Sequence, residues 1–213
     1  MTEQTNESGI SAPRSPGRPR KLEPDTILDE ALQLFWENGF STTTTRQLES
    51  HLGLNQSSIY SQFGSKQNLL ELALDRYEKL TTEELLRPLQ NATDGLDDIQ
   101  KFFDNLQRWV TSEGRKGCLL INMMAEDAAD TEEITNRTRA YRQTVKRNLR
   151  RCLELAGKRG QLLDLETAHK AELLLAFALG FNISVRGGAT KREQNNLLSA
   201  VTAQLNSWRP HAT

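Results

Sequence analysis

Cysteine is scarce in this 213-residue sequence, and long apolar runs are missing. The two cysteines, Cys118 and Cys152, are too few for a disulfide framework and lack metal-ligand spacing. The longest nearly unbroken apolar run, from Leu173 to Phe181, has nine residues, whereas a membrane-spanning helix needs about 20. The first 24 residues are polar and contain no apolar core of a signal peptide. We therefore expect a cytoplasmic protein without a bound metal or cofactor.

Neither sign of charge is in large excess. Lys and Arg total 27, Asp and Glu total 28, and the formal net charge is −1. This balance excludes a bulk polycation that coats nucleic acid. Any nucleic-acid contact must come from a local surface.

Proline and alternating apolar patterns are also rare. Beyond residue 23, proline occurs only at positions 24, 88 and 210, near apparent helix ends. Apolar residues at helical spacing fill the remainder, which predicts an all-α protein. The expected helices span 24–38, 43 or 44 to 51, 56–62, 65–88, 96–110, 118–128, 131–157, 166–186 and 193–208. The expected caps are Thr44 with Gln47, Asn55, Ser65, Asp130 with Glu133, and Thr190 with Glu193.

Residues 39–66 contain two short predicted helices joined by a glycine-containing turn, an arrangement typical of a helix-turn-helix. No Asp or Glu occurs from Ser50 to Leu70, so the second of these helices can approach a polyanion without repulsion. Five apolar residues are expected to hold the pair against Phe35 and Phe40: Leu48, Leu52, Leu54, Ile59 and Phe63.

Several motifs within residues 24–75 agree in order and spacing with a known family. They are Leu-Phe followed by Asn-Gly-Phe, then Thr-Thr-Arg-x-Leu, Leu-Gly-Leu, and Ile-Tyr-x-x-Phe-x-Ser-Lys-x-x-Leu-Leu. In these motifs the sequence resembles the TetR family of transcriptional regulators. A departure is the polar end of the second helix, Glu49 to His51, where small apolar residues are commoner. The resemblance implies a flexible basic tail (1–23), a three-helix helix-turn-helix DNA-binding domain (24–70) and a larger helical effector-binding and dimerisation domain (71–213).

The resemblance also implies which side chains contact DNA. Because the third helix carries no Arg or Lys, we expect Arg46 to supply the main guanine contact. The alternative for each residue is an ordinary solvated surface, and the surrounding pattern favours DNA contact. The expected phosphate contacts are Thr44 or Thr45, Tyr60 and Lys66, and the expected base-edge contacts are Arg46, Gln56, Ser57, Ser58 and Gln62.

Two further basic segments have less specific interpretations. In the tail, the segment Pro16-Gly17-Arg18-Pro19-Arg20-Lys21 resembles the core of an AT-hook, which predicts minor-groove contact through Arg18 and Arg20. A solubility tail with non-specific phosphate attraction is the alternative. The basic run at 137–151 is expected to be a solvated helix face with ion pairs such as Glu133 with Arg137.

The remaining predictions concern the C-terminal helices. The helix around 173–185 is apolar almost all round, so we expect one side to be buried internally and the other to meet a partner helix. As in the family, the last two helices are expected to form a dimer interface through Leu174, Ala178, Val185, Leu197, Leu198, Val201 and Leu205. The resemblance further implies an effector pocket, with expected lining residues Phe102, Phe103, Leu106, Trp109, Cys118, Asn122, Met123, Phe177, Phe181 and Asn182.

Together these features predict a dimeric repressor that binds a palindromic operator in double-stranded DNA and is released by a small molecule. One alternative is a repressor that senses oxidants or electrophiles through Cys118, although a buried structural cysteine is the simpler interpretation. Another is a helical ligand-binding protein or an enzyme without operator binding. The sequence offers no nucleophile motif, and its three histidines lie far apart, so no catalytic residue is expected.

Overall fold

The structure, a computed structural model, describes residues 23–112, 116–124, 126 and 131–210. Every regular element in these ranges is helical and none is a strand, which confirms the all-α prediction. No helix in the same ranges is long and apolar enough to cross a lipid bilayer. The elements are α1 (Pro24–Asn38), α2 (Thr45–Leu52), α3 (Gln56–Phe63), α4 (Lys66–Leu80), the π-helical turn η1 (Thr81–Leu85), α5 (Arg87–Gln90), α6 (Leu96–Thr111), α7 (Leu119–Met123), α8 (Glu132–Lys158), α9 (Thr167–Arg186) and α10 (Lys191–Ser207).

Several helices begin at the predicted caps, because polar side chains there accept the first free backbone N–H groups. Thr44 and Gln47 form a reciprocal capping box at α2. Thr190 and Glu193 form a second one at α10. Single side chains cap α3 and α4, namely Asn55 and Ser65.

Three predicted helices differ from the structure. The helix expected to run to residue 88 ends at Leu80, and η1 and α5 follow it. In η1 the backbone N–H of Leu86 bonds the carbonyl of Thr81 at 2.9 Å, a wider turn than an α-helix makes. Of the helix expected over 118–128, the described residues form only α7. Thr131 caps α8 with its hydroxyl 3.3 Å from the N–H of Ile134, and the expected cap Asp130 lies outside the described residues.

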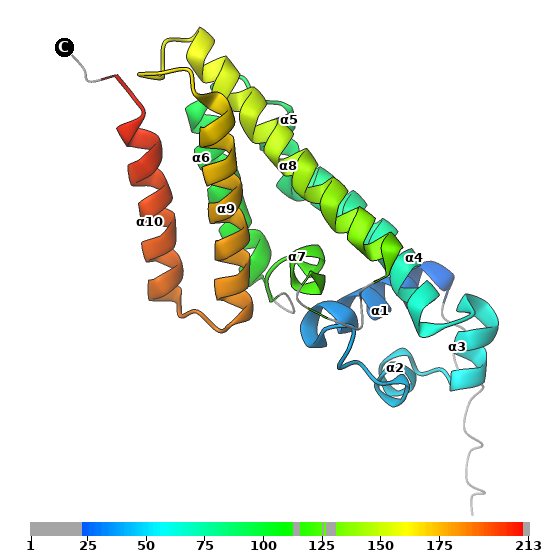
Figure 1. Ribbon diagram of the computed structural model, residues 1–213. Helices are drawn as coiled ribbons and strands as arrows, with labels where there is room; N and C mark the ends of the chain where they lie inside the picture. Colours follow the sequence, from blue (N-terminus) through cyan, green and yellow to red (C-terminus); the bar gives the residue numbers. More distant parts are fainter. Residues whose placement is uncertain (1–22, 113–115, 125, 127–130, 211–213) are drawn as a thin grey trace, which may run out of the picture.

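The first four helices form the small unit at the lower right of Figure 1. Helix α1 packs on α2 and α4, while α3 contacts α2 and α4. The rings of Phe35 and Phe40 lie 5.6 Å apart at the end of α1. The predicted apolar set is buried here, except for half-buried Leu54. The boundary predicted at residue 70 falls inside α4, which extends from this unit into the larger body.

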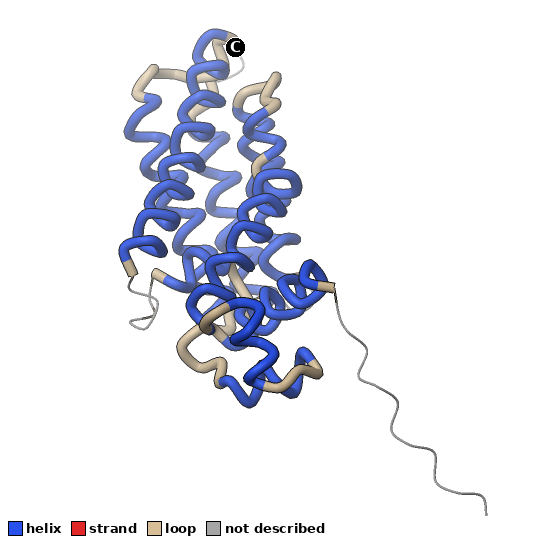
Figure 2. Tube along the Cα trace, turned by 90° about the vertical axis from the view of Figure 1, so that its right-hand side faces the viewer, coloured by secondary structure: helices blue, strands red, loops and turns tan. Residues whose placement is uncertain are grey.

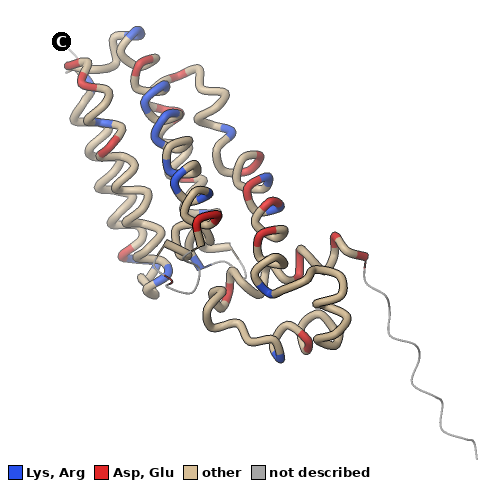
Figure 3. Tube along the Cα trace, turned by 45° about the vertical axis from the view of Figure 1, so that its right-hand side comes forward, with Lys and Arg blue, Asp and Glu red and all other residues tan. Residues whose placement is uncertain are grey.

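The larger body is a bundle in which long helices run side by side (Figure 2). Helix α8 packs on α6, α7 and α9, and α10 packs on α6 and α9. Lys and Arg residues recur along α8 (Figure 3). The predicted Glu133–Arg137 pair is present at 2.8 Å, and Lys146 pairs with Glu172 of α9 at 2.7 Å.

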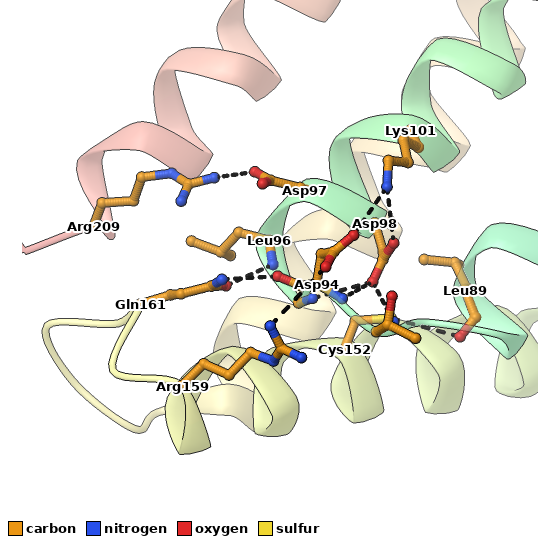
Figure 4. Close-up of polar contacts among 12 residues, drawn as sticks. Leu89, Asp94, Leu96, Asp97, Asp98, Lys101, Cys152, Arg159, Gln161 and Arg209 are labelled. Carbon is orange, nitrogen blue, oxygen red and sulfur yellow. Dashed lines mark hydrogen bonds and ion pairs between the residues drawn. The ribbon is translucent and has the colours of Figure 1, made fainter.

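A buried carboxylate organises the end of the bundle remote from α1–α3 (Figure 4). Asp98 Oδ2 accepts hydrogen bonds from the backbone N–H groups of Thr93, Asp94 and Gly95 at 2.7, 2.6 and 3.1 Å. Gln161, after α8, bonds the N–H of Leu96 at 3.1 Å. These bonds satisfy backbone donors at the start of α6 that would otherwise be unpaired.

Candidate DNA-binding surface and its links to the helical body

Helices α2 and α3 form a helix-turn-helix with a well-defined turn. Gly53 has a φ of +62°, a left-handed conformation that residues with a Cβ rarely adopt. Asn55 then caps α3 with its Oδ1 2.8 Å from the N–H of Ser58. The hydroxyl groups of Thr45 and Tyr60 lie 3.0 Å apart and join the two helices. These contacts fix the orientation of α3 relative to α2.

The outer face of α3 is polar and carries no charge. Its base-edge candidates Gln56, Ser57 and Gln62 are exposed, whereas Ser58 is half-buried. Arg46, on α2, is exposed. A carboxylate borders this surface, because Glu49 accepts a hydrogen bond from the N–H of Gln56 at 2.7 Å. The stretch without Asp or Glu, residues 50–70, therefore lies directly beside Glu49, whose carboxylate caps α3.

The expected phosphate contacts occupy different environments. Thr44 is exposed and its hydroxyl belongs to the α2 capping box. Lys66 is held against the protein, with its Nζ 2.6 Å from the carbonyl of Phe40 and 4.2 Å from the centre of that ring. Burial lowers the pKa of Lys66, opposed by the charge of Glu126. An ammonium group has three N–H donors, so the bond to Phe40 leaves donors that a phosphate could accept. Arg18 and Arg20 lie outside the described residues.

The end of α1 is bonded directly to the helical body. The indole N–H of Trp36 donates to the carbonyl of Gly117 at 2.7 Å. Nη1 of Arg186, the last residue of α9, lies 3.3 Å from the carbonyl of Trp36 and 3.2 Å from that of Glu37. A cation at the C-terminal carbonyls of a helix is favourable because those groups carry partial negative charge.

A second link joins the turn after α1 to the segment after α7. One carboxylate oxygen of Glu126 accepts from the N–H and the hydroxyl of Ser41, both at 3.0 Å. The turn is tight, because a Cβ on Gly39 would lie 2.8 Å from the other Glu126 oxygen and 3.0 Å from Arg186. No sequence pattern indicates these links, since Glu126 and Arg186 bond residues 85 and 150 positions away.

Most residues expected to line an effector pocket are packed in the body of the protein. Phe177 is an exception, because it is half-buried beside exposed Leu173 on the outer side of α9. Asn122 and Asn182 each donate to a backbone carbonyl at 2.7 Å, but their Oδ1 atoms are buried without a hydrogen-bond partner. The buried members are Phe102, Phe103, Leu106, Trp109, Cys118, Asn122, Met123, Phe181 and Asn182.

Cys118 is fully buried, with its sulfur 2.9 Å from the hydroxyl of Tyr77. The Tyr77 hydroxyl also accepts from the N–H of Leu119 at 3.1 Å, and the Tyr77 ring lies 4.8 Å from that of Trp36. Burial raises the pKa of the Cys118 thiol, although the hydrogen bond with Tyr77 opposes this. Because the thiolate is the reactive form, this environment disfavours oxidant or electrophile sensing.

The predicted dimer face requires a correction. Leu174, Ala178, Val201 and Leu205 are buried within the chain and point into its own core. The three others, Val185, Leu197 and Leu198, are half-buried. Other apolar residues of α9 face outward instead. Leu173 is 41% exposed and Ile183 is 48% exposed. A hollow of about 310 Å³ there is lined by Leu173, Ala176, Phe177, Gly180, Phe181, Ser184 and Leu197.

A braced helix-turn-helix with an exposed, uncharged second helix, joined to a larger helical body, defines a class of DNA-binding regulators. The family comparison agrees with this class. Residues 27–73 match the family of bacterial regulatory proteins named after tetR, and residues 95–202 match the tetracyclin repressor-like C-terminal domain. The chain belongs to the TetR family. It is a transcriptional regulator rather than an enzyme.

The similar proteins include named repressors and DNA-bound structures. The chain is 27% identical to the HTH-type transcriptional repressor ComR of Escherichia coli (strain K12) over 198 residues, covering 92% of this chain and 93% of ComR. It is 30% identical to the repressor BdcR of the same organism over 111 residues, 51% of this chain and 55% of BdcR. Its fold matches a cysteine mutant of the TetR family regulator CifR in complex with a 26-bp operator, with a TM-score of 0.75, 21% identity, and coverage of 90% of this chain and 100% of CifR.

Proposed function

We propose that this protein is a homodimeric repressor that binds a palindromic operator and is released by a small-molecule effector. The observation that carries the proposal is the exposed outer face of α3, which combines short hydrogen-bonding side chains with a lack of charge. Such a helix can enter a major groove closely, and Gln56 and Gln62 suit the N6/N7 edge of adenine. Exposed Arg46 suits the O6/N7 edge of guanine.

The direction of regulation is proposed from the relatives. ComR and BdcR are both named as repressors, and ComR is similar along nearly its whole length. The CifR structure contains operator DNA, which supports the same mode of action for a chain of this fold. Repression follows if the protein occupies DNA that the transcription machinery needs.

The dimer is proposed from the outer side of α9. Leu173, Phe177 and Ile183 form a partly exposed apolar stripe, and half-buried Leu197 of α10 borders it. Pairing this stripe with its symmetry copy would remove it from water and present two α3 helices to one face of DNA. A two-fold dimer reads half-sites about one helical turn apart, which is why the operator is proposed to be palindromic.

Effector release is proposed from the links to α1. Arg186 and Gly117 bond the end of α1 from the helical body. A ligand that prefers one arrangement of the body would therefore also select one placement of the two α3 helices. Release requires the ligand to bind the DNA-free form more tightly.

The test is selection of random duplex DNA with the purified full-length protein at moderate salt, followed by sequencing. A palindromic motif is the expected result. Phe177→Glu places a charge in the proposed interface, so this variant should be monomeric and select only a half-site with weaker binding. Binding that is sensitive to salt but blind to sequence would contradict the proposal, provided that circular dichroism shows a folded protein.

A further inference from the structure

Basic residues cover the exposed side of α8 along its middle. In a helix with 3.6 residues per turn, positions 139, 143, 147 and 151 form one row, and positions 142, 146 and 150 form the row beside it. Lys146 is half-buried, and the arginines in these rows are exposed. The basic members of the two rows define the α8 ridge: Arg139, Arg142, Lys146, Arg147, Arg150 and Arg151.

Most of the positive charge on the α8 ridge is not neutralised. Lys146 pairs with Glu172 of α9 at 2.7 Å, and Arg150 pairs with Glu154 at 2.9 Å. Within the described residues, no carboxylate pairs with the other members, which are Arg139, Arg142, Arg147 and Arg151. Three of these bond uncharged oxygens instead: Arg139 bonds Asn136 at 2.9 Å, Arg147 bonds Thr144 at 3.1 Å, and Arg151 bonds the carbonyl of Gln90 at 2.9 Å. The ridge therefore attracts anions.

This arrangement weakens the helix that carries it. Like charges four positions apart repel along a helix, and the ridge contains such pairs at 142 and 146, 146 and 150, and 147 and 151. Residues 134–153 contain no Asp or Glu to offset the repulsion, although the chain has 28 acidic residues. A local conflict of this kind is typical of a functional surface, because an anionic partner relieves it.

The residues around these arginines favour a nucleic-acid backbone over a protein partner. Protein interfaces centre on buried aromatic or aliphatic anchors. Contacts to a nucleic-acid backbone use Arg, Lys, Asn, Gln and Thr side chains and need no apolar anchor. The exposed residues that accompany the ridge on α8 are short or polar, namely Thr135, Asn136, Ala140 and Gln143.

A lipid surface fits the α8 ridge less well than a duplex does. A helix that lies in a membrane interface inserts an apolar face, whereas α8 packs against α6, α7 and α9 within the body. Duplex DNA carries one phosphate for about every 1.7 Å of its axis. The ridge extends about 18 Å from Arg139 to Arg151 at 1.5 Å per residue, so it can face several phosphates at once.

The α8 ridge leads away from the DNA-binding unit. Near the start of α8, Arg137 bonds Asp75 and Glu78 of α4 at 2.8 and 3.1 Å. From there the helix runs along the body and away from α1–α3 (Figure 1). A duplex that lies along the ridge is therefore a different segment from the duplex held by α3.

We propose that the α8 ridge binds the phosphate backbone of a second duplex DNA segment, without sequence preference, while α3 holds the first. The guanidinium groups without a carboxylate partner contact the phosphates, and Gln143 is a further donor in the same row. The protein then connects two DNA segments. This role does not depend on a palindromic operator, an effector or repression.

Binding to the ridge is tested in the full-length protein with Ser57→Glu and Gln62→Glu. These changes place carboxylates on the exposed side of α3, which repel DNA there. A labelled duplex of random sequence is titrated with this α3-blocked protein over a series of salt concentrations, and fluorescence anisotropy gives the Kd.

The ridge variant adds Arg139→Gln, Arg142→Gln and Arg147→Gln to the α3-blocked protein. It should bind the duplex about tenfold more weakly at low salt. The slope of log Kd against log salt should fall by about 2–3, because three phosphate contacts are lost. Its thermal unfolding temperature should stay unchanged or rise, because like-charge repulsion along α8 is reduced. Weaker binding can then be separated from unfolding.

The matched control adds Arg87→Gln, Arg108→Gln and Arg192→Gln, which remove the same charge from exposed positions on other helices. It should bind nearly as tightly as the α3-blocked protein. Equal losses in the control and the ridge variant would overturn the proposal, because only net charge would matter. Failure of the α3-blocked protein to bind duplex DNA at low salt would also overturn it. If polyglutamate of equal charge competes as well as duplex DNA, the ridge fits an acidic protein instead.

Connection of two segments is tested with α3 intact. Two duplexes of random sequence, one labelled with a donor and one with an acceptor, should show energy transfer when mixed with the wild-type protein. Protein with the three ridge changes alone should lose most of this transfer and still select the same DNA sequences as the wild-type protein. Undiminished transfer in this variant would contradict the proposal.

Discussion

Arg186 Nη1 lies 3.3 Å from the carbonyl oxygen of Trp36, so the last residue of α9 bonds the last turn of α1. The outer side of the same helix carries the apolar stripe that we propose as the dimer interface. One rigid element therefore connects the proposed partner subunit to the DNA-binding unit. The separation of the two α3 helices then depends on this bond as well as on the interface.

Replacement of Arg186 tests that connection. Arg186→Ala removes a cation that bonds two carbonyls at the end of α1. Such charged hydrogen bonds contribute about 1.5–3 kcal/mol, so operator affinity should fall roughly tenfold or more. Arg186→Lys should restore part of the loss. Arg192→Ala, an exposed change on α10, is the matched control. Operator affinity is measured by fluorescence anisotropy, and the dimer fraction is measured alongside it. An operator affinity of Arg186→Ala equal to that of the wild-type protein would exclude the coupling role.

Arg46 is predicted to read one base pair. Arg46→Ala should cost about 1–3 kcal/mol of binding and relax the preference at a single position of each half-site. Repeating the DNA selection with the variant measures both effects. Lys79→Ala, which removes an exposed charge from α4, should leave the motif intact. A uniform loss across all sequences would instead make Arg46 a phosphate contact.

The thiol of Cys118 is predicted to be unreactive in the folded protein. It is fully buried and its pKa is raised by that burial, so the thiolate is rare near neutral pH. Iodoacetamide at pH 7.5 should label Cys118 slowly before unfolding and rapidly in denaturant, as followed by peptide mass spectrometry. Labelling of the native protein at the rate of a free cysteine would contradict this prediction and support oxidant or electrophile sensing through Cys118. In a DNA-release assay with oxidants, Cys118→Ser should behave in the same way as the wild-type protein.

Asp98 is predicted to make stability depend on acid pH. Burial opposes its ionisation, but the N–H groups of Asp94 and Thr93, together with Lys101, lower its pKa. The stability that ionised Asp98 adds to the folded state is therefore complete at pH values above the unfolded-state pKa of about 3.9. It is lost as the pH falls through the lower pKa of the folded state. Asp98→Asn should reduce the free energy of unfolding by about 1–3 kcal/mol at pH 7, with a smaller difference near pH 3.

Urea denaturation at both pH values measures this dependence. Asp97→Asn is the control, because its exposed pair with Arg209 should contribute at most about 1 kcal/mol. A stability difference for Asp98→Asn that stays constant between pH 7 and pH 3 would contradict the assignment to this carboxylate.

Local chemistry in the sequence determined the helix type, several helix starts and the DNA-binding motif. Caps such as Thr44 and Asn55 act on backbone groups only two or three residues away, so their effect can be read from spacing. The apolar residues of α2 and α3 likewise predicted their own burial. Order and spacing of motifs in residues 24–75 were enough to indicate the TetR family, to which the chain belongs.

Tertiary structure decided which side of each apolar helix faces outward and which distant residues meet. Helix α9 is apolar almost all round, so its sequence could not distinguish buried Leu174 from exposed Leu173. Neighbouring helices made that choice by covering one side. The bonds of Arg186 and Glu126 to the end of α1 likewise depend on helices packed from distant parts of the chain. Capping residues and apolar periodicity do not specify these long-range contacts, because the contacts depend on how the whole bundle buries its apolar surface.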